Sequence, residues 1–121
     1  MPKTALVVDD TEMHRSATRT YLIMSGFKVD VANDGLEAMK LLNTKTFDLI
    51  VADIEMPNMN GMELLKRIRN HKQSSATPVI MLSTLDSPEM QTKLKQLGAN
   101  YYLVKPFTGE RIKAALQAVG L

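Results

Sequence analysis

Short apolar runs recur along the chain, separated by segments long enough to hold a helix, and this alternation limits the fold more than any other feature. The five runs span residues 5–8, 29–32, 49–52, 79–82 and 101–104. Four of them are apolar throughout, as is typical of parallel strands that helices cover on both faces. The run at 29–32 alternates apolar and polar residues, so we expect an edge strand that exposes one face.

The segments between the runs, and the one after the last, carry apolar residues three or four positions apart, the spacing of one helix face. The stripes are Ala17, Tyr21 and Leu22; Ala38, Met39 and Leu42; Leu64, Leu65 and Ile68; Met90, Leu94 and Leu97; and Ile112, Ala115, Leu116 and Val119. Strand and helix therefore alternate five times. Right-handed crossovers and short connections then favour an α/β fold of the flavodoxin-like (βα)5 type. Its five-stranded parallel sheet has the order 2-1-3-4-5, with helices on both faces.

Length and composition exclude several classes of protein. The 121 residues are 45% hydrophobic, which suits one domain over residues 1–121, and the absence of cysteine excludes disulfide bonds and thiolate zinc sites. No run approaches the roughly 18 apolar residues of a membrane span, and no apolar secretion segment precedes the first strand, so we expect a cytoplasmic protein without membrane contact. A formal charge of +2 and 5% aromatic residues do not favour direct nucleic-acid binding. We interpret the basic cluster at 66–72 as the solvated end of a helix.

Reactive polar groups follow four of the five runs. They are Asp9 and Asp10, Asp53, Ser83 and Lys105. Because the carboxyl ends of parallel strands share one edge, and the first and third strands are neighbours in this order, we expect these groups to converge. Two carboxylates about 4 Å apart repel by roughly 4 kcal/mol at an effective dielectric of about 20, so three of them need a cation. Mg²⁺ takes carboxylate and phosphate oxygens, and the pattern therefore predicts a site for phosphoryl transfer.

Together these motifs resemble the signature of receiver domains of two-component response regulators, especially the CheY-like, single-domain chemotaxis type. The resemblance rests on Val-Val-Asp-Asp at 7–10, on Asp53 with Met-Pro at 56–57 and Gly61 behind it, on Ser-Thr at 83–84, and on Lys-Pro-Phe at 105–107. It spans the whole chain. Asn60 stands where aspartate is frequent in the family, and either residue can start a turn. Serine at 83 replaces the more usual threonine and keeps the hydroxyl.

The resemblance implies a role for each residue of the acidic site. Asp53 would be the phosphoacceptor. Asp10, Asp53 and the backbone carbonyl of Glu55 would be the Mg²⁺ ligands, with Asp9 acting mainly through a metal-bound water. Lys105 would contact a phosphoryl oxygen. Glu55 also lies where the family tunes the lifetime of the phosphoryl group.

The resemblance also implies a conformational switch. Ser83 would donate a hydrogen bond to the phosphoryl group and move inward with the loop that follows it. Tyr102, three residues before Lys105, matches the aromatic residue that moves inward at the same time. The surface that changes would comprise the fourth helix, the fifth strand and the fifth helix. The peptide bond between Lys105 and Pro106 resembles one that is cis in the family.

On this resemblance we expect a signalling module rather than an enzyme, one that catalyses only its own phosphorylation and dephosphorylation. Its phosphodonor would be a histidine kinase. Its downstream target would be a protein such as a flagellar motor switch protein or a kinase, with no direct nucleic-acid partner. The chain itself would be a monomer or a weak dimer.

Two alternatives stay open from the residues alone. One is a receiver segment cut from a longer hybrid kinase or DNA-binding regulator. The other is a Mg²⁺-dependent phosphatase with an aspartyl nucleophile, because Glu55 supplies the acid that such enzymes carry two residues after the nucleophile. The remaining phosphatase motif and the large cap of those enzymes are missing from this sequence. Taken alone, Asp9 and Asp10 would also be ordinary helix caps.

Overall fold

The computed structural model describes residues 2–121, in which five strands and five helices alternate along the chain. The strands are β1 (Lys3–Val8), β2 (Phe27–Ala32), β3 (Leu49–Asp53), β4 (Val79–Ser83) and β5 (Tyr101–Val104). The helices are α1 (Glu12–Met24), α2 (Gly35–Leu42), α3 (Gly61–Asn70), α4 (Pro88–Gln96) and α5 (Gly109–Ala118). All neighbouring strands pair in parallel in the order β2-β1-β3-β4-β5, which confirms the flavodoxin-like architecture.

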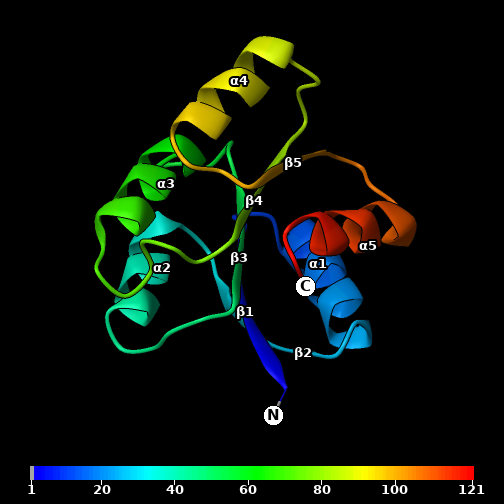
Figure 1. The fold of residues 1–121 in the computed structure, drawn as a ribbon, viewed down its shortest axis with the longest axis horizontal. Helices are drawn as coiled ribbons and strands as arrows, with labels where there is room; N and C mark the ends of the chain where they lie inside the picture. The colour runs from blue at the N-terminus through cyan, green and yellow to red at the C-terminus, as the bar shows by residue number, and fades with distance from the viewer. Residues whose placement is uncertain (1) are drawn as a thin grey trace.

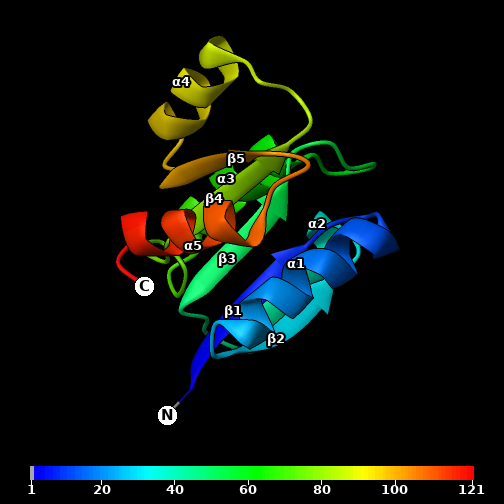
Figure 2. The same ribbon diagram turned by 90° about the vertical axis from the view of Figure 1, so that its right-hand side faces the viewer.

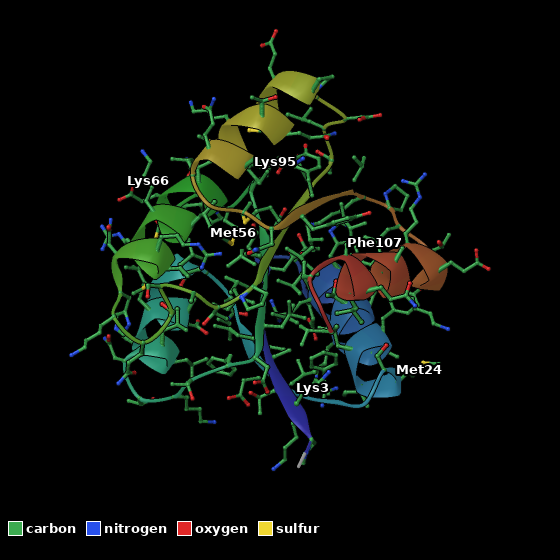
Figure 3. All side chains as sticks on the ribbon, viewed as in Figure 1. Lys3, Met24, Met56, Lys66, Lys95 and Phe107 are labelled. Atoms are coloured by element: carbon green, nitrogen blue, oxygen red, sulfur yellow. The ribbon has the colours of Figure 1, made fainter. Side chains whose placement is uncertain are left out.

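Two layers of helices enclose the sheet. Helices α1 and α5 cover one face, and α2, α3 and α4 cover the other (Figure 1, Figure 2). Because successive side chains of a strand point to opposite faces, neighbours such as Leu6 and Val7 belong to two different cores. Met56 lies in the core under α2, α3 and α4, whereas Phe107 packs against the core under α1 and α5 (Figure 3). None of the helices in residues 2–121 combines the length and the apolar character needed to cross a membrane.

Local signals set where the helices begin and end. Asp34, Asn60, Ser87 and Thr108 each accept, through the side chain, a hydrogen bond from the backbone N–H three residues further on. Asn60 therefore caps the first turn of α3, in agreement with the expectation that asparagine can replace the aspartate frequent at this position. Gly26 follows the end of α1 with a φ of +94°, a conformation that glycine adopts without strain.

Several strands extend beyond the apolar runs that predicted them. β1 begins at Lys3 rather than at residue 5, and β2 begins at Phe27 rather than at residue 29, because Lys3 and Phe27 pair through their backbones. At the other end, β3 and β4 each include one further residue, Asp53 and Ser83. Ladder hydrogen bonds join backbone groups, so a polar or exposed side chain does not end a strand.

The interpretation of residues 66–72 as a solvated helix end is wrong for Arg69, although Lys66, Arg67 and Lys72 are exposed as it expects. The guanidinium of Arg69 is half-buried and donates to the carbonyl of Gly98 at 2.7 and 3.0 Å and to the carbonyl of Thr77 at 2.7 Å. It also donates to the side-chain oxygen of Asn100 at 2.9 Å. The arginine fork thus ties α3 to the segments that lead into β4 and β5, a role that charge patterning along one helix does not reveal.

Candidate functional site

The register of the sheet brings the polar strand ends together. Val8 lies opposite Ala52 in the parallel ladder, so Asp9 and Asp53 are the next residues on two adjacent strands. Asp53 pairs in turn with Leu82, the residue before Ser83. On the last pair of strands, the backbone N–H of Lys105 donates to the carbonyl of Ser83 at 2.7 Å. Four strands therefore deliver the predicted residues to one edge.

Asp9, Asp10 and Asp53 form an acidic cluster. Each offers a carboxylate oxygen, and these oxygens lie within 4.8 Å of one another. Asp9 and Asp53 are buried, with 0% and 3% of their surface exposed, whereas Asp10 is exposed and faces solvent. A buried acidic pair with an exposed third carboxylate is open on one side, as a site that admits a hydrated cation must be.

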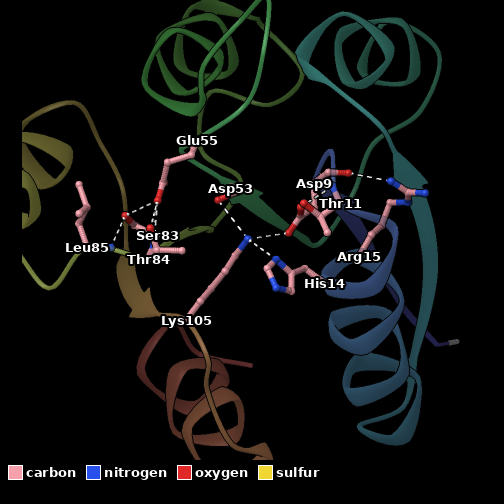
Figure 4. Close-up of polar contacts among 10 residues, drawn as sticks. All are labelled: Asp9, Thr11, His14, Arg15, Asp53, Glu55, Ser83, Thr84, Leu85 and Lys105. Atoms are coloured by element: carbon pink, nitrogen blue, oxygen red, sulfur yellow. Dashed lines mark hydrogen bonds and ion pairs between the residues drawn. The ribbon is translucent and has the colours of Figure 1, made fainter.

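Lys105 supplies the positive charge of this cluster. Its side chain is 7% exposed, and its ammonium nitrogen lies 2.9 Å from Oδ2 of Asp9 and 3.2 Å from Oδ1 of Asp53 (Figure 4). The contact with Asp9 is a hydrogen bond, and the contact with Asp53 is an ion pair without hydrogen-bond geometry. The cluster holds three carboxylates and one ammonium, which contacts two of them, so negative charge remains in excess.

Asp9 is held by Thr11, just before α1, and by Arg15 on that helix. Its Oδ1 accepts from the backbone N–H of Thr11 at 3.0 Å, and its carbonyl accepts from Arg15 at 2.9 Å. With Lys105 on Oδ2, both carboxylate oxygens of Asp9 have donors. This residue is therefore fixed in place.

Asp53 differs from Asp9 in this respect. Its buried Oδ1 has no hydrogen-bond partner within residues 2–121. Burial raises the pKa of Asp53 from its ordinary value of 3.8 to about 6, since the opposing attraction of Lys105 is smaller than the loss of solvation, and Asp9 adds repulsion. A buried oxygen that lacks a donor, beside two other carboxylates, fits a hard divalent cation and leaves a free nucleophilic group.

Ser83 and Glu55 meet at the end of β4. The Ser83 hydroxyl donates to Oε1 of Glu55 at 3.1 Å, and the same oxygen accepts from the Thr84 N–H at 2.8 Å and the Thr84 hydroxyl at 2.7 Å (Figure 4). Burial pushes the pKa of Glu55 upward, but the hydrogen bonds from Thr84 and Ser83 outweigh it and hold that pKa below its ordinary value. The sequence did not predict these side-chain contacts of Glu55. The metal-ligand role of its backbone carbonyl and its influence on the lifetime of the phosphoryl group stay predictions.

Tyr102 is half-buried on β5, outside the acidic cluster. Its hydroxyl donates to the carbonyl of Leu85, in the loop that follows Ser83. The predicted switch residue therefore contacts the predicted moving loop directly. The peptide bond between Lys105 and Pro106 is cis, as the resemblance implied.

Two residues near the site were not assigned to it from the sequence. His14 lies on α1 with Nδ1 3.3 Å from the Lys105 ammonium, and Thr84 binds Glu55 as described (Figure 4). Both signals were present: His14 stands one helical turn after Asp10, and Thr84 directly follows Ser83. His14 belongs to no motif, and Thr84 entered the resemblance only as part of the Ser-Thr pair at 83–84, without a role of its own.

Comparison with known proteins agrees with this arrangement. Residues 5–117 match the family model of the response regulator receiver domain. Chemotaxis protein CheY-3 of Vibrio cholerae is 36% identical over 115 residues, which cover 94% of this chain and 88% of that protein. Probable transcriptional regulator ycf29 of Porphyra purpurea is 39% identical over 112 residues, which cover 93% of this chain and 53% of that protein.

The chain differs in length from several of its relatives but agrees closely in fold with a solved structure. The chain spans about half the length of three curated relatives that it matches, 53%, 47% and 45%. The solved structure of Vibrio cholerae chemotaxis protein CheY4 superposes with a TM-score of 0.93 at 38% identity, covering 98% of this chain and 99% of that one. The family match over nearly the whole sequence, together with this structural agreement, shows that the chain belongs to the receiver domain family of two-component response regulators and is CheY-like.

Proposed function

We propose that this chain is a phosphorylation-controlled signalling module in which Asp53 accepts a phosphoryl group in a Mg²⁺-dependent reaction. The observation that carries the proposal is the state of the Asp53 carboxylate. It is buried among two other carboxylates and one ammonium, and its Oδ1 lacks a hydrogen-bond donor within residues 2–121. A carboxylate in this condition is available to a cation and to an electrophile.

The phosphodonor is a histidine kinase. A carboxylate oxygen of Asp53 forms a bond to phosphorus as the phosphorus–nitrogen bond of the donor's phosphohistidine breaks, and the departing imidazole nitrogen takes up a proton. Transfer between these groups needs positioning and charge compensation rather than further covalent chemistry. Beyond this self-modification and its reversal by water, the module does not turn over a substrate.

The side chains of Asp10 and Asp53 and the backbone carbonyl of Glu55 would hold Mg²⁺, with Asp9 acting mainly through water. When bound, the cation supplies positive charge beside the phosphoryl oxygens. Lys105 adds a second positive charge from the end of β5, at the same edge of the sheet, where it already lies 3.2 Å from Asp53. Asp9 keeps that ammonium in place through their 2.9 Å ion pair.

Phosphorylation changes the output surface through Ser83 and Tyr102. An aspartyl phosphate adds about 1.5 to 2 negative charges and new acceptor oxygens, which attract the Ser83 hydroxyl. Moving a population from 1:99 to 99:1 takes about 5.5 kcal/mol of differential binding, within the reach of a few charge-assisted hydrogen bonds. Tyr102 lies on β5 and contacts the loop after Ser83, so a movement of that loop also changes β5. A partner then binds the changed surface of α4, β5 and α5.

In the first candidate, residues 1–121 form one stand-alone receiver that acts in the cytoplasm as a monomer or weak dimer. Its support is the coverage of CheY-3, a chemotaxis protein matched over 88% of its own length. The target is then a protein such as a motor switch protein or a kinase, with no direct nucleic-acid partner.

A second candidate is the receiver segment of a longer regulator. Its support is the half-length coverage of the relatives that carry the description of probable transcriptional regulators. The coding sequence on both sides of these residues separates the two candidates, because a longer regulator requires a further domain in the same reading frame.

The test is a phosphorylation assay read by intact mass. The protein is incubated with Mg²⁺ and acetyl phosphate, alongside Asp53→Asn, Asp10→Asn and a chelator control. We expect one phosphoryl group on the wild type, none on Asp53→Asn, and much less with Asp10→Asn or chelator. Equal labelling of wild type and Asp53→Asn would refute the proposal. Sustained hydrolysis of a phosphate monoester would instead indicate a phosphatase.

A further inference from the structure

His14 contacts the ammonium of Lys105 beside the acidic cluster. It lies on α1, and its Nδ1 is 3.3 Å from the Lys105 nitrogen (Figure 4). Because a lysine ammonium can only donate hydrogen bonds, Nδ1 is the acceptor and the proton of the neutral ring lies on Nε2. The proposed phosphoryl chemistry gives this contact no role.

The Lys105 ammonium has three protons and three neighbouring acceptor atoms. It donates to Oδ2 of Asp9 at 2.9 Å and to Nδ1 of His14 at 3.3 Å. The third neighbour is Oδ1 of Asp53, which lies 3.2 Å away but receives no hydrogen bond. Asp9 and His14 therefore fix the directions of two N–H groups and leave the third for an oxygen bonded to Asp53.

The lysine side chain needs this second acceptor to stay in one orientation. Its ammonium stands on a flexible four-carbon stem. A cavity of about 120 Å³ lies beside the stem, and Ala17 and Phe107 are among the side chains that line it. The stem thus has room to move, and Asp9 by itself fixes only one N–H direction. His14 supplies the acceptor on the α1 side that removes the remaining freedom.

We propose that His14 is a positioning residue for Lys105, whose ammonium it orients toward an oxygen of the phosphoryl group on Asp53. This inference rests on the proposed function, since it takes Asp53 as the phosphoacceptor. A donor that is oriented beforehand stabilises the charge of the transition state without being reordered during the reaction. His14 should therefore affect the rate of phosphorylation more than it affects metal binding, in which the carboxylates take part.

The experiment compares His14→Leu and His14→Asn with the wild type. Asparagine places an acceptor oxygen about where Nδ1 stands, since both atoms are bonded to Cγ, whereas leucine has no acceptor. His14 is exposed, so both variants should keep the fold. Intact mass measures the maximal rate of phosphorylation by acetyl phosphate with Mg²⁺, and an amide NMR titration measures the Mg²⁺ affinity. A small phosphodonor avoids any effect of α1 on the docking of a kinase.

The acceptor at position 14 should set the rate. We expect His14→Leu to be phosphorylated about fivefold more slowly, because it lacks one hydrogen bond to the charged donor. His14→Asn should recover most of the wild-type rate. Both variants should bind Mg²⁺ within about twofold of the wild type. Ser16→Leu introduces the same apolar side chain at another exposed position of α1 and should match the wild type in both measurements.

The possible failures are distinguishable. If His14→Leu is phosphorylated as fast as the wild type, the positioning role is wrong. If His14→Asn is slowed as much as His14→Leu, the acceptor is not what matters and the role is again wrong. A fall in Mg²⁺ affinity that matches the fall in rate would place the effect on the metal site instead of Lys105. If the wild type takes up no phosphoryl group, the proposed function fails and this inference fails with it.

Discussion

Replacing Asp53 with asparagine should stabilise the folded protein at neutral pH when no metal is present. The pKa of Asp53 is raised from 3.8 to about 6 in the folded protein, so the folded state binds a proton at this carboxyl more tightly than the unfolded chain does. As pH rises through this window, the folded state loses the advantage of the bound proton and stability falls. At about 1.4 kcal/mol for each pKa unit, the rise from 3.8 to about 6 gives a cost of about 3 kcal/mol for the ionised carboxylate.

Asparagine has nearly the shape of the protonated carboxyl and cannot ionise. Asp53→Asn should therefore exceed the wild type in unfolding free energy by about 3 kcal/mol at about pH 7 to 8, and by nothing below about pH 4. Urea unfolding followed by circular dichroism, in the presence of a chelator, measures this difference at each pH. The exposed Asp30, paired with Lys45 at 2.7 Å, supplies the control, since Asp30→Asn should change stability by less than about 1 kcal/mol at any pH.

Two results would refute this reasoning. A stability difference that does not vary with pH would mean that the charge of Asp53 is not its cause. A destabilised Asp53→Asn at neutral pH would mean that the carboxylate is held by favourable contacts rather than strained by burial. Adding Mg²⁺ should narrow the difference, because the cation binds the folded wild type more tightly than the variant.

Three further substitutions test other parts of the account, each by urea unfolding. Lys105→Met removes the ammonium from a pair of buried carboxylates and should cost about 3 kcal/mol without metal, with part of the loss recovered in Mg²⁺; an unchanged stability would contradict the ion-pair geometry. Gly61→Ala places a Cβ 2.3 Å from the backbone carbonyl oxygen of Asp53 and should cost about 2 kcal/mol or more, so a neutral result would mean that this close approach is relaxed in solution. Arg69→Ala leaves its carbonyl acceptors without donors and should cost about 2 to 3 kcal/mol, whereas the exposed Arg67→Ala should cost less than about 1 kcal/mol; similar losses for both would show that the arginine fork has no special role.

The fold followed from the sequence because its main signals are local. Runs of four residues for the strands and helical stripes for the helices identify each element, and the rules of handedness and connection leave few topologies. The strand ends were less well predicted. Lys3 and Phe27 extend their strands by backbone pairing, which side-chain pattern does not report. Arg69 likewise binds segments far along the chain, and no pattern within α3 distinguishes it from Arg67.

The acidic cluster was predictable for the same reason that it forms, since the register of parallel strands carries residues after Val8 and Ala52 to one edge. The direction of each side chain was not. Glu55 lies two residues after Asp53, yet its carboxylate reaches the end of β4 and binds Ser83 and Thr84. The direction of the Glu55 side chain depends on the path of the loop after β3. Tertiary packing sets that path, and no local sequence pattern reports it.

The central claim is that the three carboxylates gather a metal and that Asp53 receives the phosphoryl group. A crystal structure of the protein grown with Mg²⁺ and beryllofluoride tests both parts at once. The account predicts a fluoride-bearing beryllium on an oxygen of Asp53, a Mg²⁺ ion bound by Asp10 and Asp53, and a Ser83 hydroxyl turned from Glu55 to a fluorine atom. Beryllofluoride on another residue, or an acidic cluster without metal in crystals grown at saturating Mg²⁺, would contradict it.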